Sequence, residues 1–305
     1  MTKLLPLAGT QYYAWQYVPS IPAAIIFALL FLLGTGVICW RMYKTKTLFS
    51  IPFAIGGLFE VIGYFARAAA HSHTDQLGPF VIQSILILVG PALFAASLYM
   101  TLGRLIRFIH GENHSLVRVQ WLTKIFVAGD ILSFLVQSSG GGLMASKTFP
   151  QKTAENIVLG GLCVQIIMFG FYAVVAIVFH RRMLRSPTPE AMQEGPKWQG
   201  ILTMLYASSV FIMVRSIFRV VEYVSGNGGY PMKHEWMLYL FDAVLMVGTM
   251  VVYGWWYPGD LSPSTAKPRR QWESIDGNME AGTYELRGGS STGGVDVTSH
   301  QHSRR

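Results

Sequence analysis

Ionisable and hydrogen-bonding side chains recur inside the long apolar stretches of this sequence, and within each stretch they share one helical face. In the second stretch Glu60, Tyr64 and Arg67 are spaced i, i+4 and i+7. The whole set is Glu60, Tyr64, Arg67, Asp130, Gln137, Gln165, Arg215, Arg219, Glu222, Glu235, Tyr239 and Asp242. Because hydrocarbon penalises such groups, we expect them to face a common polar interior. We interpret that interior as a candidate binding site or path for a substrate.

The free-energy penalty for the ionisable members of this set is large. A charge at the centre of a membrane helix costs about 2.5–3.5 kcal/mol. Seven unpaired charges would cost on the order of 20 kcal/mol, more than the roughly 5–15 kcal/mol by which folded proteins are stable. They are the acids Glu60, Asp130, Glu222 and Asp242 and the bases Arg67, Arg215 and Arg219. The near balance predicts ion pairs between helices, with one carboxylate left to titrate.

Two interpretations of this network stay open. It lines a substrate site or path, or it is a purely structural network that holds helices together. We expect Asp130 and Glu60, which lie nearest the centre of their stretches, to matter for mechanism. Arg67 and Glu222 lie near one interface and are expected to act as simple anchors.

Seven apolar stretches must position these side chains. Their approximate ranges are 21–40, 48–69, 80–103, 120–140, 157–179, 200–223 and 236–256. Each has about the 20 residues that a helix needs to cross the hydrocarbon core. Only 13% of the residues are charged, against about 25% in soluble domains. The sequence therefore predicts an all-α polytopic membrane protein with seven transmembrane helices.

Composition divides the chain into three parts. Residues 1–20 are predicted to form an extracellular N-terminal segment, and residues 21–257 a seven-helix membrane domain. Residues 258–305 are rich in Gly, Ser, Thr, Pro and charge, which predicts a disordered cytosolic tail. The formal charge of +8 comes from basic residues that flank the apolar stretches, so it indicates lipid headgroups and not nucleic acid as the partner.

Lysine and arginine gather in alternate connecting segments, which predicts an outside N-terminus and a cytosolic C-terminus. The sequon Asn113-His114-Ser115 then lies in the cytosol and should carry no glycan. Gly140, Gly141 and Gly142 indicate the end of the fourth helix, the alternative being a surface for close approach of a ligand. Pro91 should kink the third helix.

Motifs for several chemistries are absent. The sequence has neither a G-x-x-x-x-G-K-[ST] phosphate loop nor an H-E-x-x-H metalloprotease motif, and its seventh stretch has no lysine for a retinal Schiff base. His71, His73 and Asp75 are interpreted as a solvated loop in preference to a metal site. We therefore expect no catalytic residues, no cofactor and no metal.

The polar motifs resemble those of a known family. They include Glu60-x-x-Gly63-Tyr64-x-x-Arg67, Gly129-Asp130 with Gln137, Gly161 with Gln165, Arg215-x-x-Phe218-Arg219-x-x-Glu222, and Glu235 with Tyr239 and Asp242. Over roughly residues 15 to 257 the chain resembles the fungal lipid-translocating exporter family, the RTA-like proteins. The resemblance implies a multi-pass protein of the plasma membrane or, alternatively, of the vacuole or another internal membrane. It also implies links to sphingoid long-chain bases, to resistance against toxic amphiphiles and other membrane stress, and to porphyrin uptake.

Two functions from different classes follow. The first is a translocator or exporter of amphiphilic lipids, in which Glu60, Asp130 and Asp242 accept a cationic headgroup while the acyl chain stays in lipid. The alternative is a seven-helix receptor or sensor that responds to a lipid. Both take membrane lipids or amphiphilic small molecules as partners, and a membrane enzyme is the least favoured interpretation.

Overall fold

The computed structural model describes residues 20–71, 77–144, 150–193, 197–225 and 234–261, and in these ranges the regular structure is helical. The long helices are α1 (Ile21–Thr45), α2 (Ile51–Ala70), α3 (Leu77–Phe108), α4 (Val119–Met144), α5 (Gln151–Arg185), α7 (Lys197–Val224) and α10 (Leu245–Trp255). The short helices are η1 (Leu48–Ser50), η2 (Glu112–His114), α6 (Pro189–Gln193), α9 (Glu235–Leu238), the π-helix η3 (Tyr239–Val244) and η4 (Gly259–Leu261).

Within these ranges seven helical segments are long and apolar enough to cross a membrane, as the sequence predicted. They are Ile21–Thr45, Leu48–Ala70, Val81–Phe108, Val119–Leu143, Lys152–Arg185, Lys197–Val224 and Glu235–Trp255. The last is built from α9, η3 and α10 together. Residues 1–19 and 262–305 lie outside the described residues, so the predictions for the N-terminal segment and the tail stay predictions.

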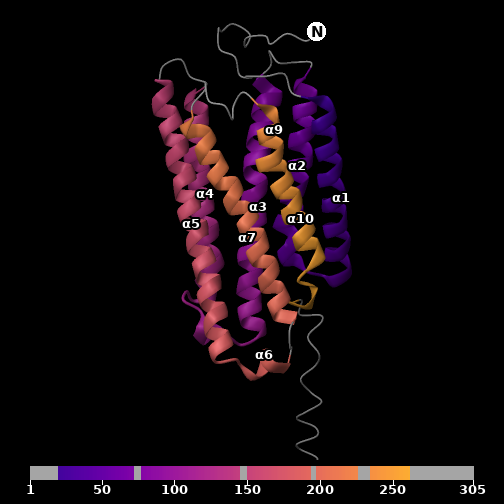
Figure 1. Cartoon of the computed structure of the whole chain (residues 1–305), viewed down its shortest axis with the longest axis vertical. Coiled ribbons are helices and arrows are strands. Elements are labelled where there is room, and N and C mark those ends of the chain that lie inside the picture. Colours follow the sequence, from indigo (N-terminus) through magenta and orange to yellow (C-terminus); the bar gives the residue numbers. More distant parts are fainter. Residues whose placement is uncertain (1–19, 72–76, 145–149, 194–196, 226–233, 262–305) are drawn as a thin grey trace, which may run out of the picture. The chain divides into compact units, whose positions relative to one another are not determined.

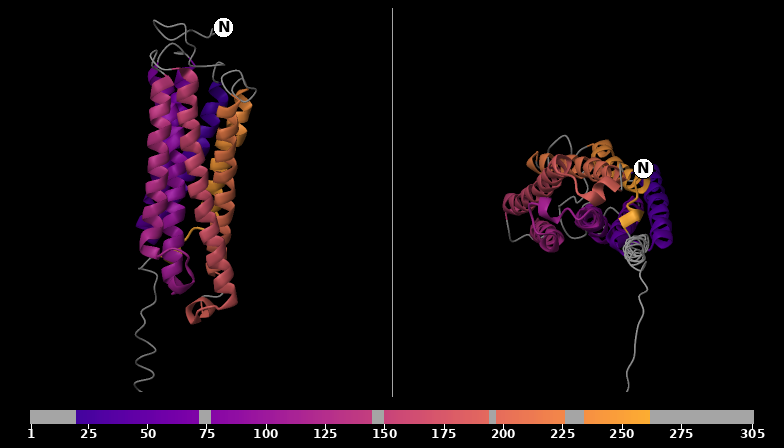
Figure 2. Two further views of the ribbon diagram at one scale, coloured as in Figure 1. Left: turned by 90° about the vertical axis from the view of Figure 1, so that its left-hand side faces the viewer. Right: turned by 90° about the horizontal axis from the view of Figure 1, so that it is seen from below.

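Helix α3 is the central element of the bundle. It packs against α2, α4 and α7, while α5 joins α4 to α7, and α1 joins α2 to α10. Figure 1 shows α4 and α5 at one side of α3 and α7, and α1, α2 and α10 at the other. The end-on view in Figure 2 shows the same grouping. Polar side chains on α3 can therefore contribute to two different helix interfaces.

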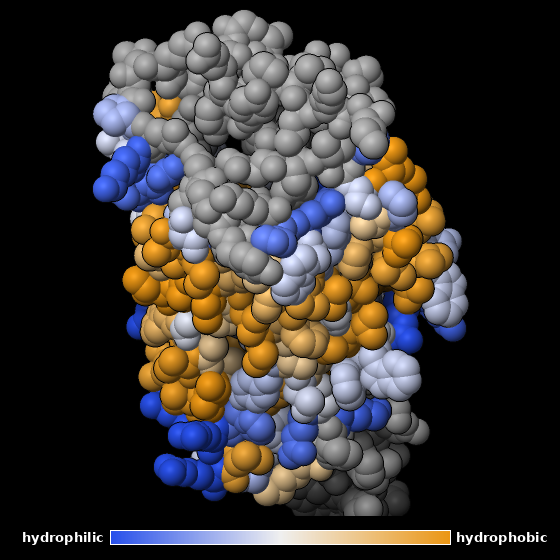
Figure 3. All heavy atoms as spheres, turned by 45° about the horizontal axis from the view of Figure 1, so that its top comes forward, coloured by the Kyte–Doolittle hydropathy of each residue, from blue (hydrophilic) through white to orange (hydrophobic). Residues whose placement is uncertain are grey.

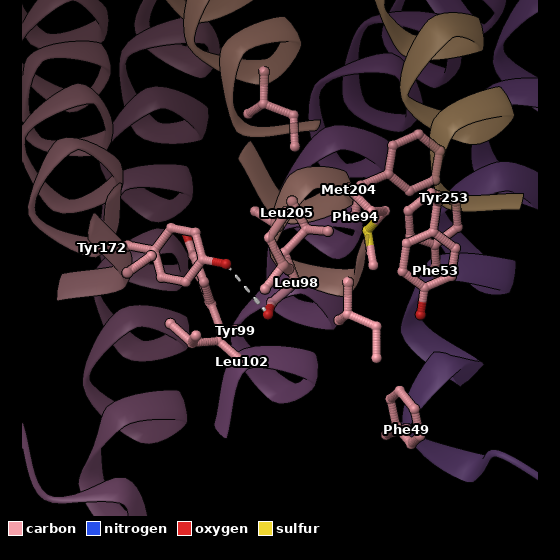
Figure 4. Packing of buried hydrophobic residues seen from close by; sticks show 14 of the residues in the cluster. Phe49, Phe53, Phe94, Leu98, Tyr99, Leu102, Tyr172, Met204, Leu205 and Tyr253 are labelled. Carbon is pink, nitrogen blue, oxygen red and sulfur yellow. Dashed lines mark hydrogen bonds between the residues drawn. The ribbon is translucent and has the colours of Figure 1, made fainter. Parts of the chain in front are cut away.

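The bundle interior is filled by aromatic and aliphatic side chains. Phe53 stacks on Phe94 and on Tyr253 with ring centroids 4.3 Å and 4.0 Å apart, and Tyr99 meets Tyr172 edge to face at 4.6 Å (Figure 4). Large apolar side chains also cover the outside, where a soluble protein would carry charge. Figure 3 shows them as a band between more hydrophilic ends. That exterior is typical of a surface that faces lipid tails.

The predicted end of the fourth helix at Gly140–Gly142 is wrong, because α4 continues to Met144. A Cβ atom on Gly140 would lie 2.6 Å from Cγ2 of Val158, so the missing side chain lets α5 approach closely. Within a bilayer, glycine is well tolerated in helices and small residues bring helix backbones together. This glycine serves close packing between helices.

The π-helix η3 was not predicted. It interrupts the seventh span at Tyr239–Val244 and contains Asp242. Single turns of π-helix are rare and are found frequently at functional sites. The sequence around Asp242 has no proline or glycine that would indicate such a turn.

Candidate functional site

A proline in α3 creates the first polar feature of the interior. Pro91 has no backbone N–H and its ring displaces the preceding turn, so the carbonyl of Ile87, four residues earlier, loses its helical donor. Nη2 of Arg215, on α7, donates to that carbonyl oxygen at 2.9 Å. A buried carbonyl that the helix leaves open is thus satisfied by a buried guanidinium, which fixes α7 against α3.

Arg215 also belongs to a buried ionic group, the arginine cluster (Arg215, Arg219, Glu222 and Asp242). Asp242 on η3 accepts from Nε of Arg215 through one carboxylate oxygen and from Nη2 of Arg219 through the other. Nη1 of Arg219 reaches Glu222 at 3.1 Å. The side chains of Arg215 and Asp242 are only 2% and 1% exposed. Two acids and two bases therefore neutralise one another at the contact between α7 and η3.

A second ionic group lies where α1 and α9 begin and α2 ends. Nη2 of Arg67 lies 3.0 Å from Oε1 of Glu235, and Nε of Arg67 donates to the Tyr239 hydroxyl at 3.2 Å. Gln83 on α3 also accepts from Arg67, at 3.4 Å. The backbone N–H of Ser20 donates to Glu235 at 3.0 Å. Arg67 was expected to be a simple anchor, but it is buried and ties α2, α3 and α9 together.

Glu60 is a buried carboxylate for which the described residues provide no ion pair. It is 1% exposed, and its Oε1 has no hydrogen-bond partner among them. A Cβ atom on Gly90 would lie 2.6 Å from Oε1, so Glu60 occupies space that a side chain on α3 would fill. Glu60 is close enough to Asp242, Arg215 and Arg219 to interact with them electrostatically. Neighbouring Tyr64 is also buried, its hydroxyl has no partner in the described ranges, and its ring stacks on Phe31 at 5.3 Å.

A separate polar group, the Asp130 site (Tyr99, Asp130, Ser133, Gln137 and Gln165), lies between α3, α4 and α5. The Tyr99 hydroxyl donates to Oδ2 of Asp130 at 2.9 Å. Nε2 of Gln137 donates to Oγ of Ser133 at 2.7 Å and to Oε1 of Gln165 at 3.1 Å. Oδ1 of Asp130 and Oε1 of Gln137 have no partner in the described part of the chain. Apart from Asp130, every member of this group is neutral.

A small cavity adjoins this site. Its lining residues are Leu88 and Ala92 from α3, Asp130, Phe134 and Gln137 from α4, and Gln165 from α5. The volume is about 10 Å³, which is close to the space that one water needs. A larger ligand would need the helices to separate.

The contacts among the described residues group most of the predicted interior into three networks. Arg67, Glu235 and Tyr239 form one, Arg215, Arg219, Glu222 and Asp242 a second, and Asp130, Gln137 and Gln165 a third. The charge tally predicted one carboxylate left over, whereas the structure leaves Glu60 and Asp130 without an ion pair among the described residues. Sequence reasoning missed the Ile87 carbonyl, for which Pro91 was an available signal. It also missed the role of the Ser20 backbone, for which there was none.

No group of three metal-binding side chains occurs within the described ranges. His73 and Asp75, which were weighed as part of a loop metal site, lie outside those ranges.

Known proteins match most of the chain. The family described as RTA1 like protein matches residues 53–265. Protein RTM1 of Saccharomyces cerevisiae is 33% identical over 285 residues, which cover 81% of this chain and 92% of that protein. Protoporphyrin uptake protein 1 of the same yeast is 34% identical over 274 residues, covering 78% and 90%. The sphingoid long-chain base transporter RSB1 of that species is 25% identical over 275 residues, covering 79% and 71%. No solved structure matches the chain.

Proposed function

We propose that this chain, which belongs to the RTA1-like family, is a translocator of amphiphilic molecules that contributes to resistance against membrane stress. Relatives are named as a sphingoid long-chain base transporter and as a protoporphyrin uptake protein. The molecules in these names, a long-chain base and a porphyrin, are both amphiphiles. We propose a long-chain amine, such as a sphingoid base, as the substrate class to test first.

This proposal rests on two buried acids that form no ion pair among the described residues. Glu60 and Asp130 are 1% and 7% exposed, and each has a carboxylate oxygen without a partner in the described residues. Ionisable groups are rare inside membrane proteins, and they commonly mark pathways for ions or substrates. A cationic headgroup would supply the ion-pair partner that the described residues do not provide for either acid.

Asp242, which the sequence suggested as a third headgroup acceptor, is not part of this proposal. Its two oxygens already bind Arg215 and Arg219. A ligand would have to break two buried ion pairs to reach it. Breaking such a pair strongly destabilises the protein, because it leaves a buried charge without a partner.

The test is flux by purified protein in liposomes. A fluorescent long-chain base is added outside vesicles, and its arrival at the inner leaflet is followed by protection from a membrane-impermeant quencher. Vesicles that hold the full chain should equilibrate the probe faster than protein-free vesicles and faster than vesicles that hold an unrelated seven-helix protein. Equal rates in all three would contradict the proposal.

A lipid-responsive receptor or sensor is the second candidate, and one observation favours it. The cavity beside Asp130 measures about 10 Å³, so the described packing offers no lipid-sized conduit there. Under this alternative a lipid biases two packings of the bundle. Saturable binding of the fluorescent base without flux would support the sensor, whereas binding with flux supports the translocator. Under neither candidate is the protein an enzyme, and formation of a lipid product by purified protein would contradict both.

We infer that the protein resides in the plasma membrane, with its N-terminus outside and its tail in the cytosol. The basic ends of connecting segments support this orientation: His114, the middle residue of the sequon, bonds Ser186 at 2.9 Å, next to the arginines that end α5. Positively charged segments of this kind stay on the cytosolic side. Asn113 should then carry no glycan, and a gel shift that is lost in Asn113→Gln would reverse the orientation. Microscopy of a fluorescent fusion tests the membrane.

A further inference from the structure

Two residues of the Asp130 site that carry an oxygen without a partner among the described residues line the same cavity. Oδ1 of Asp130 and Oε1 of Gln137 have no hydrogen-bond donor among the described residues, and both residues line the cavity of about 10 Å³. Their side chains are 7% and 4% exposed. A buried acceptor without a donor is unfavourable, so two of them around one cavity need an explanation.

The orientation of Gln137 is set by its neighbours. The Ser133 hydroxyl donates to the carbonyl of Gly161 at 2.7 Å, so its oxygen can accept from Nε2 of Gln137. The same Nε2 donates to Oε1 of Gln165. Because the amide nitrogen is used twice, the amide oxygen of Gln137 is left as the free acceptor. Asp130 and Gln137, which both line the cavity, therefore each have one oxygen acceptor to offer a ligand.

Two kinds of ligand could fit this cavity, a neutral water and a small cation, and they differ in charge. A water has the right size and could donate to both oxygens, but it would leave Asp130 an uncompensated anion. The titratable groups that face it from the packed helices are Tyr99 on α3 and, in contact with Tyr99, Tyr172 on α5. No arginine, lysine or histidine forms an ion pair with Asp130 among the described residues. Burial of a bare carboxylate is unfavourable unless a positive charge accompanies it.

We propose that Asp130 and Gln137 form a binding site for one small monovalent cation at the interface of α3, α4 and α5. Two sources share this chemistry. One is a proton, which binds Oδ1 of Asp130 and leaves a water to bridge to Gln137. The other is Na⁺, which prefers oxygen ligands and would take the place of the single water for which the cavity has room. Asp130 is also a proposed headgroup acceptor, so the small cation and the headgroup would replace one another at this carboxylate. Such a site would supply a coupling ion, which goes beyond the proposed translocation, on which it rests, and gives it a source of energy in a chain without a phosphate-binding loop.

The test measures cation binding through folding stability, because a ligand that binds only the folded state stabilises it. The full chain is placed in nanodiscs of neutral lipid, and its unfolding temperature is recorded in two series. The first exchanges choline chloride for NaCl at fixed pH and ionic strength. The second lowers the pH in choline chloride without Na⁺. A site for Na⁺ raises the unfolding temperature in the first series, and a site for a proton raises it in the second.

Variants assign the effect to these residues. Asp130→Asn should abolish the rise that the wild type shows, while Glu190→Gln, a change to a carboxylate on α6 far along the chain, should keep it. Gln137→Leu removes the second oxygen and should weaken cation affinity about tenfold or more. If Asp130→Asn does not fold, Gln137→Leu decides the matter, since an unchanged dependence in that variant overturns the proposal.

Two results would overturn the inference directly. One is that the wild type and Asp130→Asn respond equally to both series. The other is that choline stabilises as well as Na⁺ and pH has no effect that depends on Asp130. The flux assay keeps the two proposals apart. Cation-dependent stability without flux contradicts translocation alone, and flux without cation dependence contradicts the cation site alone.

Discussion

The two sides of α3 hold buried carboxylates in different ways. On one side Asp242 binds two arginines, and Arg215 also fills the carbonyl that Pro91 leaves open in α3. On the other side Asp130 has a tyrosine as its only described hydrogen-bond partner, and its neighbours are neutral amides and a hydroxyl. The first arrangement satisfies its charges within the fold. The second leaves the charge of Asp130 without an ion-pair partner among the described residues.

The helices on the two sides are also held together by different contacts. The arginine cluster joins α7 to η3 through ion pairs, which must break before the helices separate. Helices α4 and α5 meet instead through glycines: a Cβ on Gly161 would lie 2.7 Å from Cγ of Gln137. Separating closely packed small residues, unlike separating an ion pair, leaves no buried charge uncompensated. We therefore assign stability to the arginine cluster and ligand exchange to the Asp130 site.

The largest loss of stability is expected on removing the charge of Asp242. Asp242→Asn leaves Arg215 and Arg219 without their shared carboxylate inside the bundle, and breaking a buried pair in this way costs about 3–5 kcal/mol. Unfolding in detergent micelles measures the change. Asp242→Glu, which keeps the charge, should recover much of the loss. Wild-type stability in Asp242→Asn would remove the arginine cluster from its structural role.

A smaller loss is expected on the other side when space between α4 and α5 is filled. In Gly161→Ala the new Cβ would lie 2.7 Å from Cγ of Gln137 and 3.0 Å from the Ser133 carbonyl oxygen. Such overpacking costs about 1–3 kcal/mol. Gly160→Ala, on the same helix, is the matched control, because a Cβ atom there would have nothing within 4 Å. Equal unfolding temperatures for the two variants would show that this interface is not closely packed.

The smallest loss within the arginine cluster is expected at its edge. The side chains of Arg219 and Glu222 are 16% and 12% exposed, and Arg219 keeps Asp242 when Glu222 is neutralised. Glu222→Gln should therefore reduce stability by less than about 1 kcal/mol. The same unfolding assay measures it, with Asp242→Asn as the reference. A loss as large as that of Asp242→Asn would mean that the more exposed Glu222 matters as much as Asp242, so that the cluster acts as one unit.

Helical periodicity predicted the seven spans and the inward faces, because the apolar stretches are long and the polar residues keep their spacing. It could not predict the partners. Spacing places Asp130 and Asp242 on inward faces alike, and only the packing order of the helices decides that one meets two arginines and the other none. Counting acids and bases says nothing about the distances between them. The count therefore could not show that two carboxylates stay without an ion pair among the described residues.

Local backbone irregularities explain the rest of what the sequence did not reveal. Pro91 predicts an open carbonyl at Ile87, but nothing along the chain predicts that Arg215 fills it. The π-helix at Tyr239–Val244 changes the direction of the residues around Asp242 relative to a regular helix. A regular helix of 3.6 residues per turn therefore predicts an inaccurate direction for Asp242, the residue that holds the arginine cluster together.

The most direct test of the division between the two sides is the flux of fluorescent long-chain base through liposomes that contain Asp130→Asn, at matched protein content. The substitution removes one charge that has no ion pair among the described residues, so the unfolding temperature should stay near that of the wild type while flux falls to the rate of protein-free vesicles. Flux at the wild-type rate in a folded Asp130→Asn protein would contradict the account.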